Sequence, residues 1–357
     1  MQKVERKSNI ELLRIISMCG VIILHFNNSS IGGGLDIMEK NQLNGWLSYI
    51  LESTFICSVN VFILISAYFL SNTYKRKISK VICLLSDVIV LSVIVYFLKV
   101  IIAHQRFSIS SLITAAIPEN WFVILYITLY LISPYINLVI DNLSNEQLKR
   151  MLALSIILFS IIPTLTDILC EISGREWMGI STIGAYGSGW GYTIINFILV
   201  YIIGAYLRKN EDIKIKHLIF KIVICVCTLS IWAYINNLTG FRTERSAWEY
   251  CNPIILLEAA YVFLLFKRLE IPNIRLINRI AQSAFMVYLL HGQFVKRFYI
   301  KKLVESNILI MFLGYIVMCV LIYLICCIID TIYKYAMSPY YREVEKFDTK
   351  DIRIENR

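Results

Sequence analysis

The sequence predicts an all-α, polytopic integral membrane protein. Of its 357 residues, 58% are hydrophobic and only 17% are charged, and the mean hydropathy is +0.66. Soluble domains are about half apolar and a quarter charged. Residues 308–329 hold no charged side chain, and residues 81–103 hold one lysine and one aspartate. A run of about 20 apolar residues is enough to cross the hydrocarbon core of a bilayer.

Ten apolar segments are predicted as spanning helices, and almost all of the chain lies in or between them. The predicted spans are 10–26, 46–70, 81–103, 121–140, 151–169, 192–207, 218–235, 253–266, 280–294 and 308–333. We therefore expect one membrane domain over residues 1–333 and a short tail over residues 334–357. The first span is predicted to be retained, because Arg14 lies inside it and no small-residue cleavage site follows it.

The distribution of lysine and arginine predicts the orientation. Basic residues concentrate in alternate loops, which places both termini in the cytoplasm by the positive-inside rule. The net charge of +10 is therefore assigned to topology, and nucleic-acid binding is not expected. One basic cluster falls on the predicted outer side, at Lys296, Arg297, Lys301 and Lys302.

The first predicted span, "ELLRIISMCGVIILH", carries three ionisable residues: Glu11, Arg14 and His25. Arg14 and His25 are eleven positions apart, which is close to three helical turns, so both face nearly the same direction about 16 Å apart. Glu11 precedes Arg14 by three positions and can pair with it. Ionisable residues inside a span indicate a functional site, although a snorkelling ion pair and an interfacial histidine are the alternatives.

The chemistry of these residues favours proton transfer and anion recognition. A histidine takes up a proton near neutral pH, so His25 can deprotonate a hydroxyl. An arginine recognises a phosphate, a carboxylate or a polarised carbonyl. No metal-binding motif is present in the sequence, and no metal or tightly bound cofactor is expected.

A long predicted outer loop is rich in glycine and aromatic residues. It reads "CEISGREWMGISTIGAYGSGWG" and precedes the sixth span. Its aromatic rings can stack on sugar rings, or they can belong to the aromatic belt at the membrane interface. Both interpretations remain open from the sequence.

Several motifs along the chain resemble those of the membrane acyltransferase type 3 family. "NIELLRIISMCGVIILHF" has the family's arginine, ten residues, then histidine. "NVFILISAYFL" resembles its second-span motif, with Ala67 where the family has glycine. "NWFVILYITLYLISPYIN", "FILVYIIGAYL" and "SAFMVYLLHG" resemble the fourth, sixth and penultimate spans.

This resemblance implies an acyltransferase that moves an acyl group, usually acetyl, from cytosolic acyl-CoA to a hydroxyl of a cell-envelope carbohydrate. His25 would be the general base or a transient acyl carrier, and Arg14 would position the donor. Glu11 is expected to pair with Arg14. The resemblance also implies a stand-alone enzyme without the extracytoplasmic domain that some relatives carry.

Further site residues are expected on the same basis. Lys75, Arg76 and Lys77 lie in a basic inner loop that suits the coenzyme A phosphates, or simply obeys the positive-inside rule. Ser66 and Trp121 are family-based candidates. His291 is either a residue of the outer vestibule or an ordinary interfacial histidine.

The implied location is the plasma membrane of a bacterium, with acyl-CoA, an envelope polysaccharide or lipid-linked glycan, and membrane lipids as partners. The sequence leaves the oligomeric state open. A flippase for lipid-linked glycans is the alternative function, although the sequence shows neither clear inverted repeats nor helices broken by glycine and proline.

Overall fold

The structure is a computed structural model that describes residues 6–37, 42–175, 189–240, 246–295, 300–350 and 352–353. Its contacts divide the chain into two compact units, which are described one at a time. Unit 1 comprises Met1–Phe69 and Leu143–Asp330, and unit 2 comprises Leu70–Asn142 and Thr331–Arg357.

Unit 1 is built from helices. Its elements are α1 (Ser8–Asn27), η1 (Leu35–Ile37), α2 (Gln42–Phe55), α3 (Ser58–Leu70), α7 (Asn145–Ile156), η2 (Ile157–Ile161), α8 (Ile162–Ser173), η3 (Gly189–Gly191), α9 (Ile194–Lys209), α10 (Leu218–Leu238), α11 (Pro253–Arg268), α12 (Arg275–Ile280), η4 (Ala281–Ser283), α13 (Ala284–Val295), α14 (Ile300–Val304) and the first part of α15 (Ile308–Glu345).

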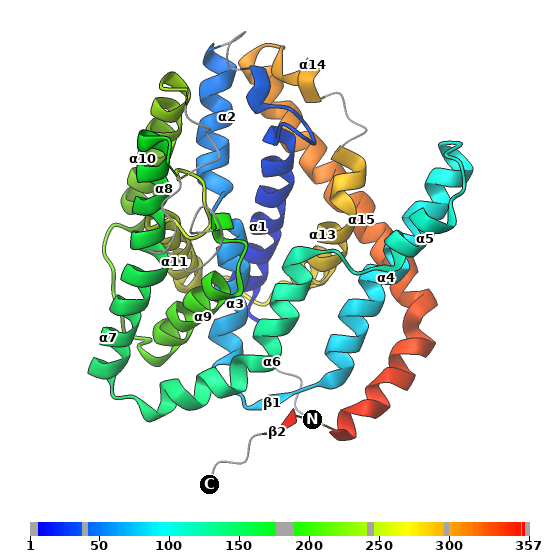
Figure 1. The fold of residues 1–357 in the computed structure, drawn as a ribbon. Helices are drawn as coiled ribbons and strands as arrows, with labels where there is room; N and C mark the ends of the chain where they lie inside the picture. The colour runs from blue at the N-terminus through cyan, green and yellow to red at the C-terminus, as the bar shows by residue number, and fades with distance from the viewer. Residues whose placement is uncertain are drawn as a thin grey trace. The chain divides into compact units, whose positions relative to one another are not determined.

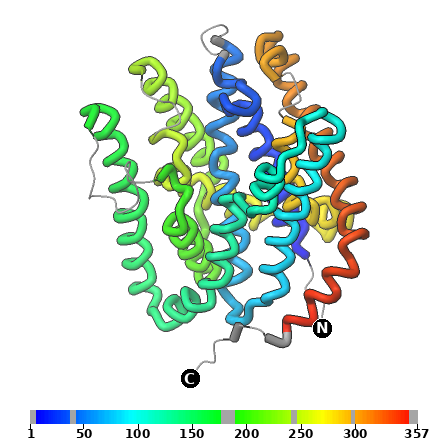
Figure 2. The backbone as a smooth tube through the Cα atoms, turned by 45° about the vertical axis from the view of Figure 1, so that its right-hand side comes forward, coloured from blue at the N-terminus to red at the C-terminus, as the bar shows by residue number. Residues whose placement is uncertain are grey.

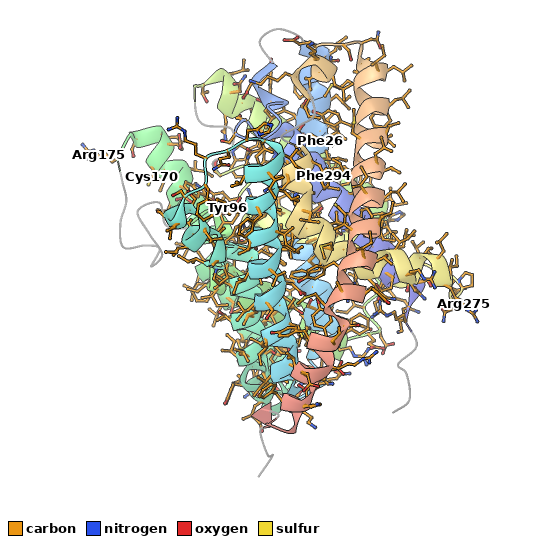
Figure 3. All side chains as sticks on the ribbon, turned by 90° about the vertical axis from the view of Figure 1, so that its right-hand side faces the viewer. Phe26, Tyr96, Cys170, Arg175, Arg275 and Phe294 are labelled. Atoms are coloured by element: carbon orange, nitrogen blue, oxygen red, sulfur yellow. The ribbon has the colours of Figure 1, made fainter. Side chains whose placement is uncertain are left out.

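Unit 2 adds a helical hairpin and a short strand pair. Its elements are β1 (Lys75–Arg76), α4 (Ile78–Ile102), α5 (Ile109–Ala116), α6 (Trp121–Asn142), the last part of α15, η5 (Lys346–Lys350) and β2 (Ile352–Arg353). Helix α5 packs back against α4, as Figure 2 shows. Tyr96 of α4, labelled in Figure 3, donates a hydrogen bond from Oη to the Ser108 carbonyl at 2.8 Å. Strands β1 and β2 pair in antiparallel register, Lys75 opposite Arg353.

The prediction of an all-α polytopic membrane protein is confirmed. Within the described residues, seven helical stretches are long and apolar enough to cross a membrane. The three remaining predicted spans are also helical but shorter, and they form α9, α11 and η4 with α13. The expected second span is interrupted, since α2 ends at Phe55 and α3 begins at Ser58. The expected tail is helical at first, because α15 continues past residue 333 to Glu345.

Helix α1 is enclosed by other helices of unit 1. It packs against α2, α11, α12 and α13 (Figure 1). Its twenty residues rise about 30 Å, which matches the hydrocarbon thickness. The Asn9 side-chain amide donates to the Phe266 carbonyl at 3.0 Å and to the Leu269 carbonyl at 3.1 Å. These bonds occupy carbonyls at the C-terminal end of α11, and they fix the start of α1 against α11.

Helices α3 and α9 approach each other closely at Gly204. A Cβ atom added there would lie 2.6 Å from the Cβ of Ala67, which itself is fully buried. The family motif has glycine at the position of Ala67. In this chain the small residue that permits the close contact is on the partner helix α9.

Candidate active site

Helix α1 presents its ionisable residues as the sequence predicts, because it runs without a break from Ser8 to Asn27. Glu11 is buried, and its carboxylate lies between two arginines. Arg14 Nε is 3.8 Å from Glu11 Oε2, and Arg6 Nη1 is 3.8 Å from Glu11 Oε1. The expected pairing of Glu11 with Arg14 is therefore present as an ion pair. Within the described residues neither Glu11 Oε2 nor Arg14 Nε makes a hydrogen bond.

At the other end of α1, His25 meets His291 of α13. Nδ1 of His25 forms a hydrogen bond with Nε2 of His291. The two rings are nearly parallel, with 8° between their planes and 4.5 Å between their centroids. Figure 3 labels Phe26, which follows His25 on α1, and Phe294, three residues after His291 on α13. His291 is buried inside the protein, with an exposed fraction of 3%.

His25 also lines a cavity of about 320 Å³ inside unit 1. The cavity lies between the end of α1, helix α2 and the segments around residues 190 and 250. Its other lining residues are Val21, Leu24, Asn28, Leu35, Glu52, Ile56, Trp190, Tyr192, Trp248 and Tyr250. The volume is within the range of small-molecule sites, and aromatic side chains with a few polar groups are typical of such sites.

Glu52 is the carboxylate of this cavity, and sequence reasoning missed it. Its Oε2 accepts a hydrogen bond from the Asn27 amide at 2.9 Å, and Tyr315 Oη donates to Asn27 Oδ1 at 3.2 Å. Glu52 is thus held by a buried chain of polar groups from α1 and α15. A lone glutamate within the apolar segment 46–70 was the available signal, since ionisable residues in spans are costly.

A tight turn holds two aromatic rings at the cavity. Trp190 has a φ of 56°, a left-handed conformation that is unfavourable for a bulky residue. The turn is fixed by a 3.1 Å hydrogen bond from the Tyr250 N–H to the Trp190 carbonyl. Gly191 has a φ of 79°, and a Cβ there would lie 2.7 Å from the Cys251 nitrogen. Trp190 and Tyr192 stay 44% and 45% exposed, so their rings remain accessible.

Trp190 belongs to the aromatic outer loop that the sequence analysis singled out. Residues 176–188 of that loop lie outside the described residues, as do Lys296 and Arg297 of the expected outer basic cluster. Lys301 of that cluster pairs with Asp36, with 3.6 Å between Nζ and Oδ2.

In unit 2, the predicted basic loop is a structural element. Arg76 is fully buried. Its Nε donates to the Tyr130 carbonyl and to Ser133 Oγ, and its Nη1 donates to the Thr73 carbonyl. Lys77 pairs with Asp348 at 3.1 Å. Phosphate binding by Arg76 would require this network to open, whereas Lys75 and Lys77 are both exposed.

The remaining family-based candidates lie on separate elements. Ser66 is half-buried on α3 in unit 1. Trp121 is the first residue of α6 in unit 2, where its ring meets Phe122 edge-on at 5.8 Å. Neither is among the residues that line the cavity.

Besides the basic loop of residues 75–77 in unit 2, a cationic group occurs in unit 1, where α3, α9 and α11 end. Arg208 and Lys267 both lie over the Tyr68 ring, at 4.9 and 5.2 Å from its centroid. Glu211 accepts a 3.0 Å hydrogen bond from Tyr68 Oη and pairs with Arg208 at 2.7 Å. These contacts, first that of Tyr68, lower the pKa of Glu211 below 4.5. Two cations with one anion leave this group net positive.

The described residues hold no group of three or more His, Cys, Asp and Glu side chains arranged for a metal ion. The side chains that line the cavity include the imidazole of His25, the carboxylate of Glu52 and accessible aromatic rings.

A family model described as an acyltransferase domain matches residues 7–331. The chain belongs to the membrane acyltransferase type 3 family. No curated protein and no solved structure matches the chain. As a member of this family the protein is an acyltransferase of groups other than amino-acyl groups, and its apolar helices make it a membrane protein.

In this membrane acyltransferase, the family match covers α1 to the middle of α15. Both residues of the arginine–histidine motif lie on α1, and the histidine is the one that reaches the aromatic cavity. Glu52 and Trp190 are the residues that the motif comparison did not provide.

Proposed function

We propose that this protein transfers an acyl group, most simply acetyl, from cytosolic acyl-CoA to a hydroxyl of a surface polysaccharide or its lipid-linked precursor in a bacterial plasma membrane. The observation that carries the proposal is the cavity in which His25 meets Glu52 and exposed aromatic rings. Aromatic faces stack on the apolar faces of sugars, and a carboxylate accepts hydrogen bonds from sugar hydroxyls.

In the proposed reaction the sugar hydroxyl attacks the thioester carbonyl. His25 accepts the hydroxyl proton, the carbon–sulfur bond breaks, and the proton passes to the departing thiolate to give free coenzyme A. The products are an O-acyl sugar and a thiol. In the covalent variant of this reaction, His25 first takes the acyl group from the thioester and then passes it to the sugar.

Arg14 is proposed to position the donor from the cytoplasmic end of α1. Its guanidinium has an Nε that makes no hydrogen bond within the described residues, and it can bind a phosphate of the donor while the thioester extends toward His25. The net positive group of Tyr68, Arg208, Glu211 and Lys267 is a second candidate for binding the phosphates of coenzyme A, in addition to the loop of Lys75.

The test uses purified protein in proteoliposomes with radiolabelled acetyl-CoA and an oligosaccharide acceptor. The variants are His25→Ala, Arg14→Ala and Trp190→Ala, with His104→Ala as the matched control because His104 is an exposed residue of unit 2. We expect His25→Ala to lower transfer about 10²- to 10⁴-fold. Trp190→Ala is expected to raise KM for the sugar and leave KM for acetyl-CoA unchanged.

Label on the protein in the absence of sugar would identify the acyl-histidine route. Undiminished transfer by both His25→Ala and Arg14→Ala, with normal folding, would exclude the site. Transport of a lipid-linked glycan without ester formation would instead support the flippase.

A further inference from the structure

The histidine pair has a defined hydrogen-bond direction that the family motif does not describe. His291 Nδ1 lies 2.9 Å from the carbonyl oxygen of Val287, one turn earlier on α13. A carbonyl oxygen only accepts hydrogen bonds, so Nδ1 of His291 must carry a proton. The other ring nitrogen, Nε2, faces Nδ1 of His25.

Burial decides the charge of His291. The side chain is 3% exposed, and transferring an unpaired charge into an apolar environment is costly. His291 is therefore neutral, with its single proton on Nδ1. Its Nε2 then has a lone pair and accepts a hydrogen bond from His25.

We propose that His291 is a positioning residue that holds His25 as the tautomer protonated on Nδ1. In this tautomer the lone pair of His25 is on Nε2, and His25 is the member of the pair that lines the cavity. The chain of bonds runs from His25 Nδ1–H to His291 Nε2, and from His291 Nδ1–H to the Val287 carbonyl. That His25 is the base in acyl transfer rests on the proposed function; the tautomer assignment does not.

During acyl transfer the hydrogen bond between the two histidines keeps its direction. His25 Nε2 takes the proton of the sugar hydroxyl and becomes an imidazolium. The Nδ1–H bond to His291 then becomes a charge-assisted hydrogen bond, which is stronger than the neutral one. His291 keeps its own proton throughout, and His25 returns the proton on Nε2 to the departing thiolate.

A purely structural role for His291 makes a different prediction. If His291 only fills space between α1 and α13, an apolar side chain of similar size would serve equally well. Two substitutions separate these roles. His291→Leu removes both hydrogen-bonding groups, whereas His291→Gln keeps an oxygen that accepts from His25 and an amide that donates to Val287.

The first measurement is ¹⁵N NMR of the full protein labelled on histidine. The chain has four histidines, of which His104 and His217 are exposed. The ¹⁵N signals of His25 are assigned as those missing from the spectrum of His25→Ala. We expect His25 to be protonated on Nδ1 in the wild type and in His291→Gln. In His291→Leu we expect the Nε2-protonated form or a mixture. A wild-type His25 protonated on Nε2, or an unchanged tautomer in His291→Leu, would overturn the proposal.

The second measurement is the rate of acetyl transfer. His291→Leu is expected to lower kcat about 10²-fold with KM for acetyl-CoA unchanged, and His291→Gln is expected to restore most of it. Wild-type kcat in His291→Leu would overturn the positioning role. Absence of transfer in every variant including the wild type would contradict the proposed function, whereas the NMR result would still decide the tautomer.

Discussion

The proposed chemistry of this protein is concentrated in a few side chains of the cavity in unit 1. His25 supplies a basic nitrogen, Glu52 supplies a carboxylate held by Asn27, and Trp190 supplies an accessible ring. The arginine–histidine motif identified His25 from the sequence because its spacing repeats after three helical turns. Glu52 and Trp190 could not be placed in the same way, since they come from other elements and meet His25 only through tertiary packing.

Substitution of Glu52 tests whether the carboxylate contacts the sugar. Glu52→Gln keeps the size of the side chain and removes the charge. Hydrogen bonds to charged groups contribute about 1.5–3 kcal/mol, so we expect kcat/KM for the sugar to fall about 10- to 100-fold. Steady-state kinetics with varied sugar at saturating acetyl-CoA measures this effect.

The matched control for Glu52 is Glu146→Gln. Glu146 is an exposed glutamate of α7 that pairs with Lys149 at 2.9 Å, far along the chain from the cavity residues. Equal losses in Glu52→Gln and Glu146→Gln, or no loss in Glu52→Gln, would remove Glu52 from the sugar site.

At the scale of the elements, sequence patterns located the helices but not their interruptions. All ten apolar segments are helical, because long apolar runs have few other structures available in a membrane. The break between α2 and α3 lies within a continuous apolar run and involves no proline or glycine, so nothing local signals it. The burial of Arg76 could not be predicted either, because the sequence of a basic loop is the same whether its arginine binds a ligand or holds the loop together.

The contact between α3 and α9 gives a test of helix packing. Gly204→Ala places a methyl group 2.6 Å from the Ala67 Cβ, and overpacking of this kind costs about 1–3 kcal/mol. We expect a lower Tm for purified Gly204→Ala in detergent. The double variant Ala67→Gly with Gly204→Ala moves the small residue to α3, as in the family motif, and should recover part of the loss. A double variant no more stable than Gly204→Ala would show that Ala67 is not the obstructing neighbour.

The loop after α9 gives a prediction for pH. Tyr68, and then Arg208 and Lys267, lower the pKa of Glu211 below 4.5. A carboxyl group with a depressed pKa contributes stability above its unfolded pKa, and that contribution is lost as the pH falls through the folded value. The Tm of the wild type should therefore fall more between about pH 5 and pH 3 than that of Glu211→Gln. Parallel decreases in both proteins would show that Glu211 contributes nothing to this dependence.

For the whole molecule, the family, the helical class and the histidine of the first span were all accessible from sequence. The family match over residues 7–331 confirms the first of these. The division into two units was not foreseen, because unit 2 combines residues 70–142 with the end of the chain. The predicted single domain over residues 1–333 rests on hydropathy alone, which carries no information about long-range contacts.

The two ends of α1 hold the two groups to which the proposed reaction assigns the donor and the acceptor. Arg14 and His25 stand about 16 Å apart on one unbroken helix, which is half the thickness of the hydrocarbon core. A donor bound from the cytoplasm and a sugar bound in the cavity would therefore meet along this helix.

The most direct test of this central claim is a sided transfer assay in oriented proteoliposomes. Radiolabelled acetyl-CoA is supplied only on the side of the termini, oligosaccharide only on the opposite side, and labelled ester is counted with time. We expect ester formation by the wild type and by His104→Gln, and a loss of about 10²-fold or more for His25→Gln. Ester formation at the wild-type rate by His25→Gln would show that His25 is not the base in acyl transfer.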